Sequence, residues 1–114
     1  MESTNTRQQK IAKQIQKDIA EIIQREYSAS LRGTLVTVTT VRVSVDLAYA
    51  KIYVSVFPFD RAKATLDFLD EQNRAIRGAL GNRMRNQVKS IPELQFFIHD
   101  SLEYIENIDN LLSK

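Results

Sequence analysis

The sequence contains no cysteine, no tryptophan and a single histidine in 114 residues. Without cysteine the chain cannot form disulfides or a thiolate zinc site, so a reducing compartment suits it. The histidine, His99, is followed by Asp100 and Ser101, but neighbouring side chains on a strand point to opposite faces and cannot form a catalytic triad. One histidine and dispersed carboxylates give no metal-ligand cluster, and no phosphate loop or dinucleotide fingerprint is present. We therefore expect no metal, no cofactor and no enzymatic activity.

Long hydrophobic runs are missing as well. No stretch approaches the roughly 20 apolar residues that a membrane helix needs. The polar segment Met1–Gln9 does not resemble a secretory signal. We therefore expect a cytoplasmic protein without a membrane partner. The composition, 43% hydrophobic and 26% charged, suits one globular domain over residues 1–114.

The hydrophobic pattern predicts the order α-β-β-α-α-β-α and hence an α+β fold, with helices covering a three-stranded sheet. Helices are expected over Thr6–Tyr27, over about Arg61–Val88 and from Asp100 onward, and strands over Leu35–Val45, Ala50–Val56 and Leu94–Ile98. In the first strand the valine alternation changes frame near Thr39–Thr40, which predicts a β-bulge. Asn73 interrupts the apolar stripe of the long helical region, so we expect a break around Gln72–Arg74.

Charge is unevenly distributed along the second half of the chain. Residues 74–89 contain five basic residues and no acidic one, whereas residues 90–114 contain five acidic residues and one lysine. Such segregation suggests a polyanion contact on one side of the molecule. Two solvated helix faces would give the same pattern, and the charges alone favour neither interpretation.

A helical wheel places six residues of the basic segment on one face. They are Arg74, Arg77, Gly78, Gly81, Arg85 and Lys89. The glycines would expose bare backbone to a phosphate while arginine forks donate to its oxygens, and counterion release would supply affinity. The alternative is that the glycines let another element of the same protein pack closely. We favour the nucleic-acid interpretation, with a weaker second group formed by Arg83 and the first-helix cations Arg7, Lys10, Lys13 and Lys17.

Several motifs in sequence order resemble the ribosome-binding factor A family. They are Thr34–Tyr53, the pair Ile76-Arg77 followed by Leu80–Arg85, Ile91–Phe97 and Asp100–Leu112. The string Gly78-Ala79-Leu80-Gly81 also spells the G-x-x-G of KH domains. The resemblance implies a type II KH-like fold and a non-catalytic factor that binds the small (30S) ribosomal subunit late in maturation. It further implies contact with 16S rRNA near the decoding region and importance for growth in the cold. We expect a monomer when the protein is free.

This sequence departs from the family pattern at one position. The family has an Ala-x-Gly kink between its two central helices, and Gln72-Asn73-Arg74 stand in its place here. Asparagine tolerates left-handed backbone angles better than most residues. We therefore expect the kink at Asn73, with Gly78 and Gly81 remaining helical.

A different class of function is a protein–protein adaptor that docks its acidic carboxy-terminal helix onto a basic partner. Salt separates the two hypotheses, because phosphate contacts predict a steep, roughly linear loss of log affinity with log salt.

Overall fold

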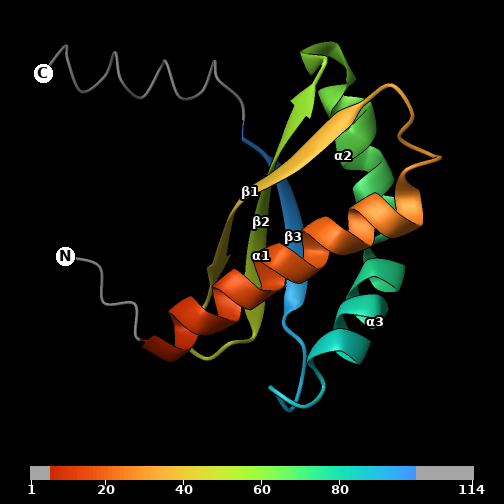
Figure 1. The fold of residues 1–114 in the computed structure, drawn as a ribbon. Helices are drawn as coiled ribbons and strands as arrows, with labels where there is room; N and C mark the ends of the chain where they lie inside the picture. Colours follow the sequence, from red (N-terminus) through yellow and green to blue (C-terminus); the bar gives the residue numbers. More distant parts are fainter. Residues whose placement is uncertain (1–5, 100–114) are drawn as a thin grey trace, which may run out of the picture.

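A computed structural model describes residues 6–99 (Figure 1). The elements are α1 (Thr6–Tyr27), β1 (Leu35–Val43), β2 (Tyr49–Phe57), the short 3-10 helix η1 (Phe59–Arg61), α2 (Ala62–Glu71), α3 (Asn73–Met84) and β3 (Glu93–Ile98). This order confirms the predicted α-β-β-α-α-β sequence of an α+β fold. The helix expected from Asp100 onward lies outside the described residues.

The three strands form one sheet in the order β1-β2-β3. β1 pairs with β2 antiparallel, and β3 joins β2 parallel. The register of the first pair shifts between Val38 and Thr40, which confirms the predicted bulge and leaves Thr39 as the extra residue. The parallel pairing requires a long crossover from β2 to β3. The helices α2 and α3 supply that crossover.

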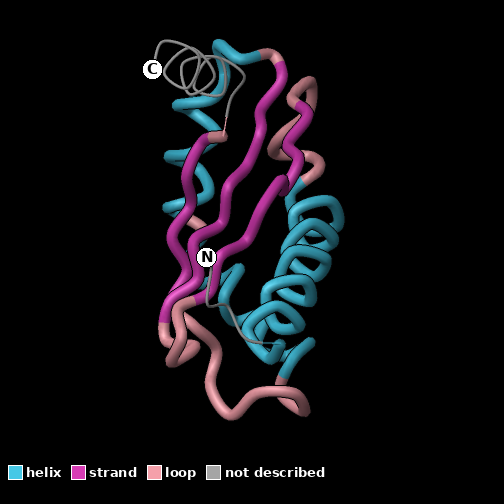
Figure 2. The backbone as a smooth tube through the Cα atoms, turned by 90° about the vertical axis from the view of Figure 1, so that its left-hand side faces the viewer, coloured by secondary structure: helices cyan, strands magenta, loops and turns pink. Residues whose placement is uncertain are grey.

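The core lies between the helices and one face of the sheet. Ile15 and Ile19 of α1, and Ile76 and Leu80 of α3, are completely buried. They pack against the alternate residues of the strands that point the same way, of which Ile52 is also completely buried. Figure 2 shows the three strands in front, with the helices behind and beside them. Within residues 6–99, the helices therefore cover one face of the sheet and leave the other without a helix.

Glutamine side chains fasten α1 to the outer edge of β1. The side-chain nitrogen of Gln8 donates to the carbonyl of Val43 at 2.9 Å. That of Gln16 donates to the carbonyls of Val38 and Thr39, at 3.2 and 3.3 Å. These carbonyls belong to an edge strand, where the outward-facing backbone groups otherwise need water or a partner. The position of α1 is thus fixed by polar contacts as well as by its apolar stripe.

The break between α2 and α3 falls at Gln72, whose φ and ψ are −91° and 5°. The expected break around Gln72–Arg74 is confirmed, but it falls at Gln72 and not at Asn73, which is the first residue of α3 and has no positive φ. Its side-chain nitrogen donates instead to the carbonyl of Leu94 in β3, at 2.9 Å. An asparagine at this position therefore ties the helix junction to the last strand. Gly78 and Gly81 lie inside α3, as expected.

Candidate nucleic-acid interface

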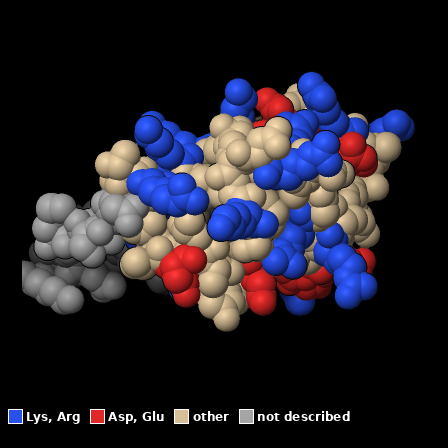
Figure 3. Space-filling model, turned by 90° about the horizontal axis from the view of Figure 1, so that it is seen from below, with Lys and Arg blue, Asp and Glu red and all other residues tan. Residues whose placement is uncertain are grey.

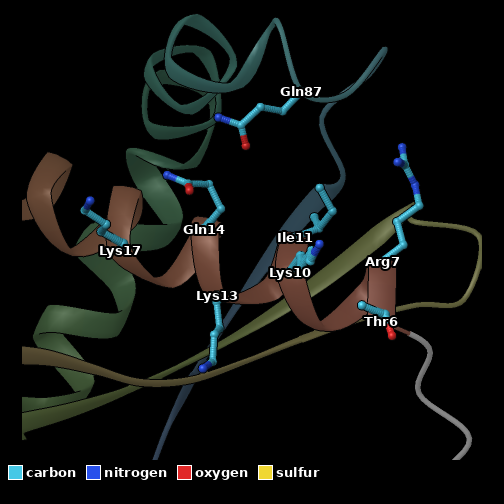
Figure 4. Close-up of a pocket in the computed structure, with 8 residues that line it drawn as sticks. All are labelled: Thr6, Arg7, Lys10, Ile11, Lys13, Gln14, Lys17 and Gln87. Carbon is cyan, nitrogen blue, oxygen red and sulfur yellow. The ribbon is translucent and has the colours of Figure 1, made fainter.

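A basic groove runs along the amino-terminal half of α1, facing the turn that follows α3 (Figure 4). Its lining consists of Thr6, Arg7, Lys10, Ile11, Lys13, Gln14, Lys17 and Gln87. The cations recur at helical spacing, so one side of α1 carries a row of positive charge. In Figure 4, Gln14 and Gln87 point toward each other across the groove, whereas Lys13 points away from Gln87. We call Arg7, Lys10, Lys17, Gln14 and Gln87 the basic groove.

The groove combines exposed charge with side-chain amides. Arg7, Lys10 and Lys17 are exposed. The side-chain nitrogen of Gln14 donates to Asp18 at 3.0 Å, which orients the Gln14 amide at the wall of the groove. Amide groups both donate and accept, so they can reach a base edge or a sugar while the cations meet phosphates. Figure 3 views the molecule from below and shows Lys and Arg spread over this side, broken by scattered acidic side chains.

Arg85 and Lys89 extend the positive surface beyond α3. Both are exposed and stand two residues to either side of Gln87, which lines the groove. Val88 between them is buried and anchors the turn to the core. The structure therefore places these two cations of the predicted helical face on the turn that faces α1. The sequence alone predicts these two groups of cations as separate sites, a primary one and a weaker one.

Arg83 has a structural partner. Its guanidinium donates to Asp18 at 3.2 Å and to Glu21, and so joins α3 to α1. Asp18 is a buried carboxylate with a side chain only 7% exposed. The hydrogen bond from Arg83 lowers the pKa of Glu21 below its ordinary value of 4.5. The RNA contact of Arg83 stays a prediction; because its Nη1 already donates to two carboxylates of the same protein, Arg83 is not counted in the basic groove.

The other half of the predicted face lies beside β3. Arg74, Arg77 and Gly78 line a second groove with Ile91 and several further residues. Arg77 donates through Nε to the carbonyl of Pro92 at 3.0 Å and through Nη2 to that of Ile91 at 2.6 Å. Three carboxylates share the lining of this groove, namely Asp70, Glu71 and Glu93. The surface around Arg74 and Arg77 is thus mixed in charge, and the guanidinium of Arg77 is already engaged in holding the segment before β3.

The two glycines of α3 differ in their surroundings. A Cβ on Gly81 would lie 3.4 Å from Cγ1 of Ile91, whereas a Cβ on Gly78 would meet no atom within 4 Å. Gly81 therefore fits the alternative in which a glycine permits close packing within the protein. Gly78 alone exposes bare backbone, and it does so beside Arg74 and Arg77.

His99 lies at the end of β3, away from the basic groove. Its Nδ1 is 3.0 Å from the hydroxyl of Thr39, and its ring meets that of Tyr53 edge to face. Among residues 6–99, no three His, Cys, Asp or Glu side chains are grouped so that they could hold a metal ion. No helix in the same range is long and apolar enough to cross a membrane.

The family model for ribosome-binding factor A matches residues 7–112. The chain belongs to the ribosome-binding factor A family. Ribosome-binding factor A of Christiangramia forsetii is 42% identical over 110 residues, covering 96% of this chain and 83% of that protein. The Flavobacterium johnsoniae protein is 42% identical over 108 residues, covering 94% and 83%. The resemblance found in the sequence motifs is thereby confirmed.

Solved structures of family members have the same fold. The crystal structure of ribosome-binding factor A from Thermus thermophilus matches with a TM-score of 0.69 at 27% identity, covering 80% of this chain and 94% of that one. A second match is a homology model of Thermus thermophilus ribosome-binding factor A, as fitted into the cryo-EM map of a 30S complex with that factor. It has a TM-score of 0.60 at 31% identity and covers 75% and 88% of the two chains.

Proposed function

We propose that this chain binds the small ribosomal subunit through 16S rRNA during late maturation, in the cytoplasm, and acts by occupying RNA without catalysing a reaction. The observation that carries the proposal is the 31% identical Thermus thermophilus relative, which was fitted into the map of a 30S complex. The basic groove supports it, because cations on a rigid helix can neutralise closely spaced phosphates.

The proposed contact has two parts. Arg7, Lys10 and Lys17 on α1, with Arg85 and Lys89 on the turn after α3, meet phosphates of the RNA backbone. Gln14 and Gln87 lie among these cations and contact base edges or sugars. Phosphate contacts set the position of the protein on the RNA but do not distinguish one base from another. The fold of the RNA junction and the two amides therefore determine together which RNA site is bound. Such a contact holds an rRNA junction in an immature or sheltered arrangement until the factor is released.

Co-sedimentation of the chain with purified small and large ribosomal subunits tests the partner. We expect the chain to pellet with small subunits and to remain in the supernatant with large ones, with binding that weakens steeply as salt rises. Equal pelleting with both subunits would show a general affinity for RNA and contradict the proposal. Lys13→Gln serves as a control in the same assay, because Lys13 points away from Gln87 and its loss should cost less than that of Lys10.

The role in maturation needs a cellular test. We expect cells that lack the gene to accumulate 16S rRNA precursors, most strongly in the cold, and expect the wild-type gene to remove the precursors. A gene carrying Arg7→Gln, Lys10→Gln and Lys17→Gln should restore less processing at an equal protein level. Normal processing in the absence of the gene would refute the maturation role while leaving subunit binding intact.

A further inference from the structure

The sheet face opposite the core carries an aromatic pair. On β2, Ala50, Ile52 and Val54 point into the core, so the residues between them point outward. Tyr53 of β2 pairs in register with Phe97 of β3. Their rings are stacked, with centroids 5.3 Å apart and planes 26° apart. In Figure 2, the strands that carry both residues lie in front of the helices, so no helix of residues 6–99 covers this face.

Neighbouring contacts hold the pair in place without hiding it. The ring of His99 meets Tyr53 edge to face at 6.2 Å, and Nδ1 of His99 is 3.0 Å from the hydroxyl of Thr39 at the bulge. Phe97 nevertheless remains 37% exposed. Thr39 at the bulge thus contacts His99, which in turn packs against Tyr53 at the edge of the aromatic pair. These contacts hold the rings in a defined position.

Two cations stand beside the pair on the same face. Arg42 of β1 and Lys51 of β2 are directly opposite each other in register, and both are exposed. Lys51 is two residues from Tyr53 on one strand, which places their Cα atoms roughly 7 Å apart.

The face is not continuously apolar, because polar side chains lie between the aromatic pair and the exposed Leu35, Phe57 and Tyr49 at its two ends. Thr40 pairs with Tyr53, Gln95 pairs with Lys51, and Thr37 pairs with Ser55. Thr37 and Ser55 separate the aromatic pair from the exposed Leu35 and Phe57. Lys51 and Gln95 separate it from the exposed Tyr49 at the other end of β2. An isolated aromatic pair among hydroxyls, an amide and cations is typical of base stacking on a sheet, whereas a protein partner usually needs a contiguous apolar patch.

We propose that this face is a second RNA-binding surface, the aromatic platform, formed by Tyr53, Phe97, Arg42 and Lys51. It takes an unpaired strand, with a base stacked on the rings and phosphates at the two cations. The proposal rests on the proposed function, because it assumes that the natural ligand is ribosomal RNA. The platform and the basic groove lie on different sides of the molecule, so one chain would contact two separate RNA segments.

The test uses the full chain and a fluorescein-labelled unstructured RNA of ten uridines, followed by fluorescence anisotropy. Replacing both rings with leucine (Tyr53→Leu, Phe97→Leu) keeps apolar bulk and removes stacking, and should weaken binding roughly 5- to 100-fold. Phe57→Leu is the matched control, since it removes an exposed aromatic ring outside the platform and should leave binding unchanged. Arg42→Gln with Lys51→Gln keeps the rings, and should lower the slope of log Kd against log salt by about 0.7 per lysine or arginine lost.

A direct readout of stacking comes from Tyr53→Trp, because the wild-type chain has no tryptophan. The indole fluorescence should be quenched as the RNA saturates the protein. Absence of quenching, or unchanged RNA affinity of the leucine variant, overturns the platform. Labelling of Lys51 in the full chain that is much weaker than that of the exposed Lys63 would show that this face is covered, and overturns the platform too. Each result leaves the proposed function standing, since small-subunit binding is scored separately by sedimentation.

Discussion

The charge of the basic groove gives the sharpest prediction. In the triple variant Arg7→Gln, Lys10→Gln, Lys17→Gln, each side chain keeps its polarity and loses its charge. All three residues are exposed on α1, and within residues 6–99 none of them forms an ion pair. Surface changes of this kind usually alter the free energy of unfolding by less than about 0.5 kcal/mol. Loss of binding would therefore report the contact with RNA and not the stability of the fold.

The magnitude follows from counterion release. Each phosphate contact contributes about 0.7 to 0.9 to the slope of log affinity against log salt. Loss of three contacts should lower the slope by roughly 2 to 3. If the affinities of wild type and variant converge near 1 M salt, binding at 0.1 M salt should weaken by roughly 100- to 500-fold.

The assay measures the Kd for small ribosomal subunits at four or more salt concentrations by co-sedimentation. The matched control, Arg32→Gln, Arg61→Gln, Lys63→Gln, removes the same charge from exposed residues that do not line the groove. It should retain a slope close to that of the wild type. If both variants lost the same slope, binding would depend on net charge alone, and the groove would not be the contact. An unchanged slope in the groove variant would refute the assignment of these residues.

Three further predictions concern the scaffold. Asn73→Ala removes the hydrogen bond to the carbonyl of Leu94 and should lower the free energy of unfolding, measured by urea titration, by about 1 kcal/mol. Asn82 is exposed on the same helix, and Asn82→Ala should leave the free energy of unfolding undiminished. The hydrogen bond from Arg83 lowers the pKa of Glu21, so this contact stabilises the fold at pH values above 4.5 and its contribution is lost as pH falls through the lowered pKa. Glu21→Gln should therefore abolish part of the decrease in unfolding midpoint that the wild type shows below pH 4.5. Equal acid sensitivity of the variant and the wild type would contradict the pairing. The methyl group of Gly78→Ala would meet open space, so this variant should raise the free energy of unfolding by about 0.5 to 1 kcal/mol. Gly81→Ala should give a smaller increase, because its methyl group would lie against Ile91. Calorimetry of the two variants measures both free energies of unfolding.

Local patterns in the sequence predicted the elements well. The isoleucines of α1 and the stripe of Ile76 and Leu80 are buried as their helical spacing indicates. The change of frame among the valines located the bulge at Thr39, because one extra residue reverses which side chains face the core. These features depend on neighbours in the chain, so a sequence is enough to find them.

Contacts between distant residues could not be predicted in the same way. Arg83 was predicted as a weaker RNA contact, and its ion pairs could not be foreseen because its partners Asp18 and Glu21 lie on another helix. Arg77 is similar, since the carbonyls that bind it belong to the segment before β3. Nothing in the sequence pairs Gln87 with α1 either. Gln14 could have been predicted from the sequence, because it stands four residues after Lys10 and therefore on the same face of the helix.

The aromatic pair of the sheet can be predicted only in part from the sequence. The alternation that buries Ala50, Ile52 and Val54 also places Tyr53 on the opposite face. The parallel pairing of β3 with β2 is what brings Phe97 beside it, and strand order is not encoded in either strand alone. The candidate platform therefore required the three-dimensional structure.

The glutamines that fasten α1 to β1 have a consequence for recognition. Gln8 and Gln16 hold one flank of the helix through carbonyls of the edge strand, and Arg83 holds the other flank through Asp18. The helix that presents Lys10 and Lys17 is thus braced on two sides before any ligand arrives. Because such a helix loses little backbone entropy on association, more of the electrostatic attraction is retained as affinity. A nucleic acid would meet an array of charges whose spacing is already set.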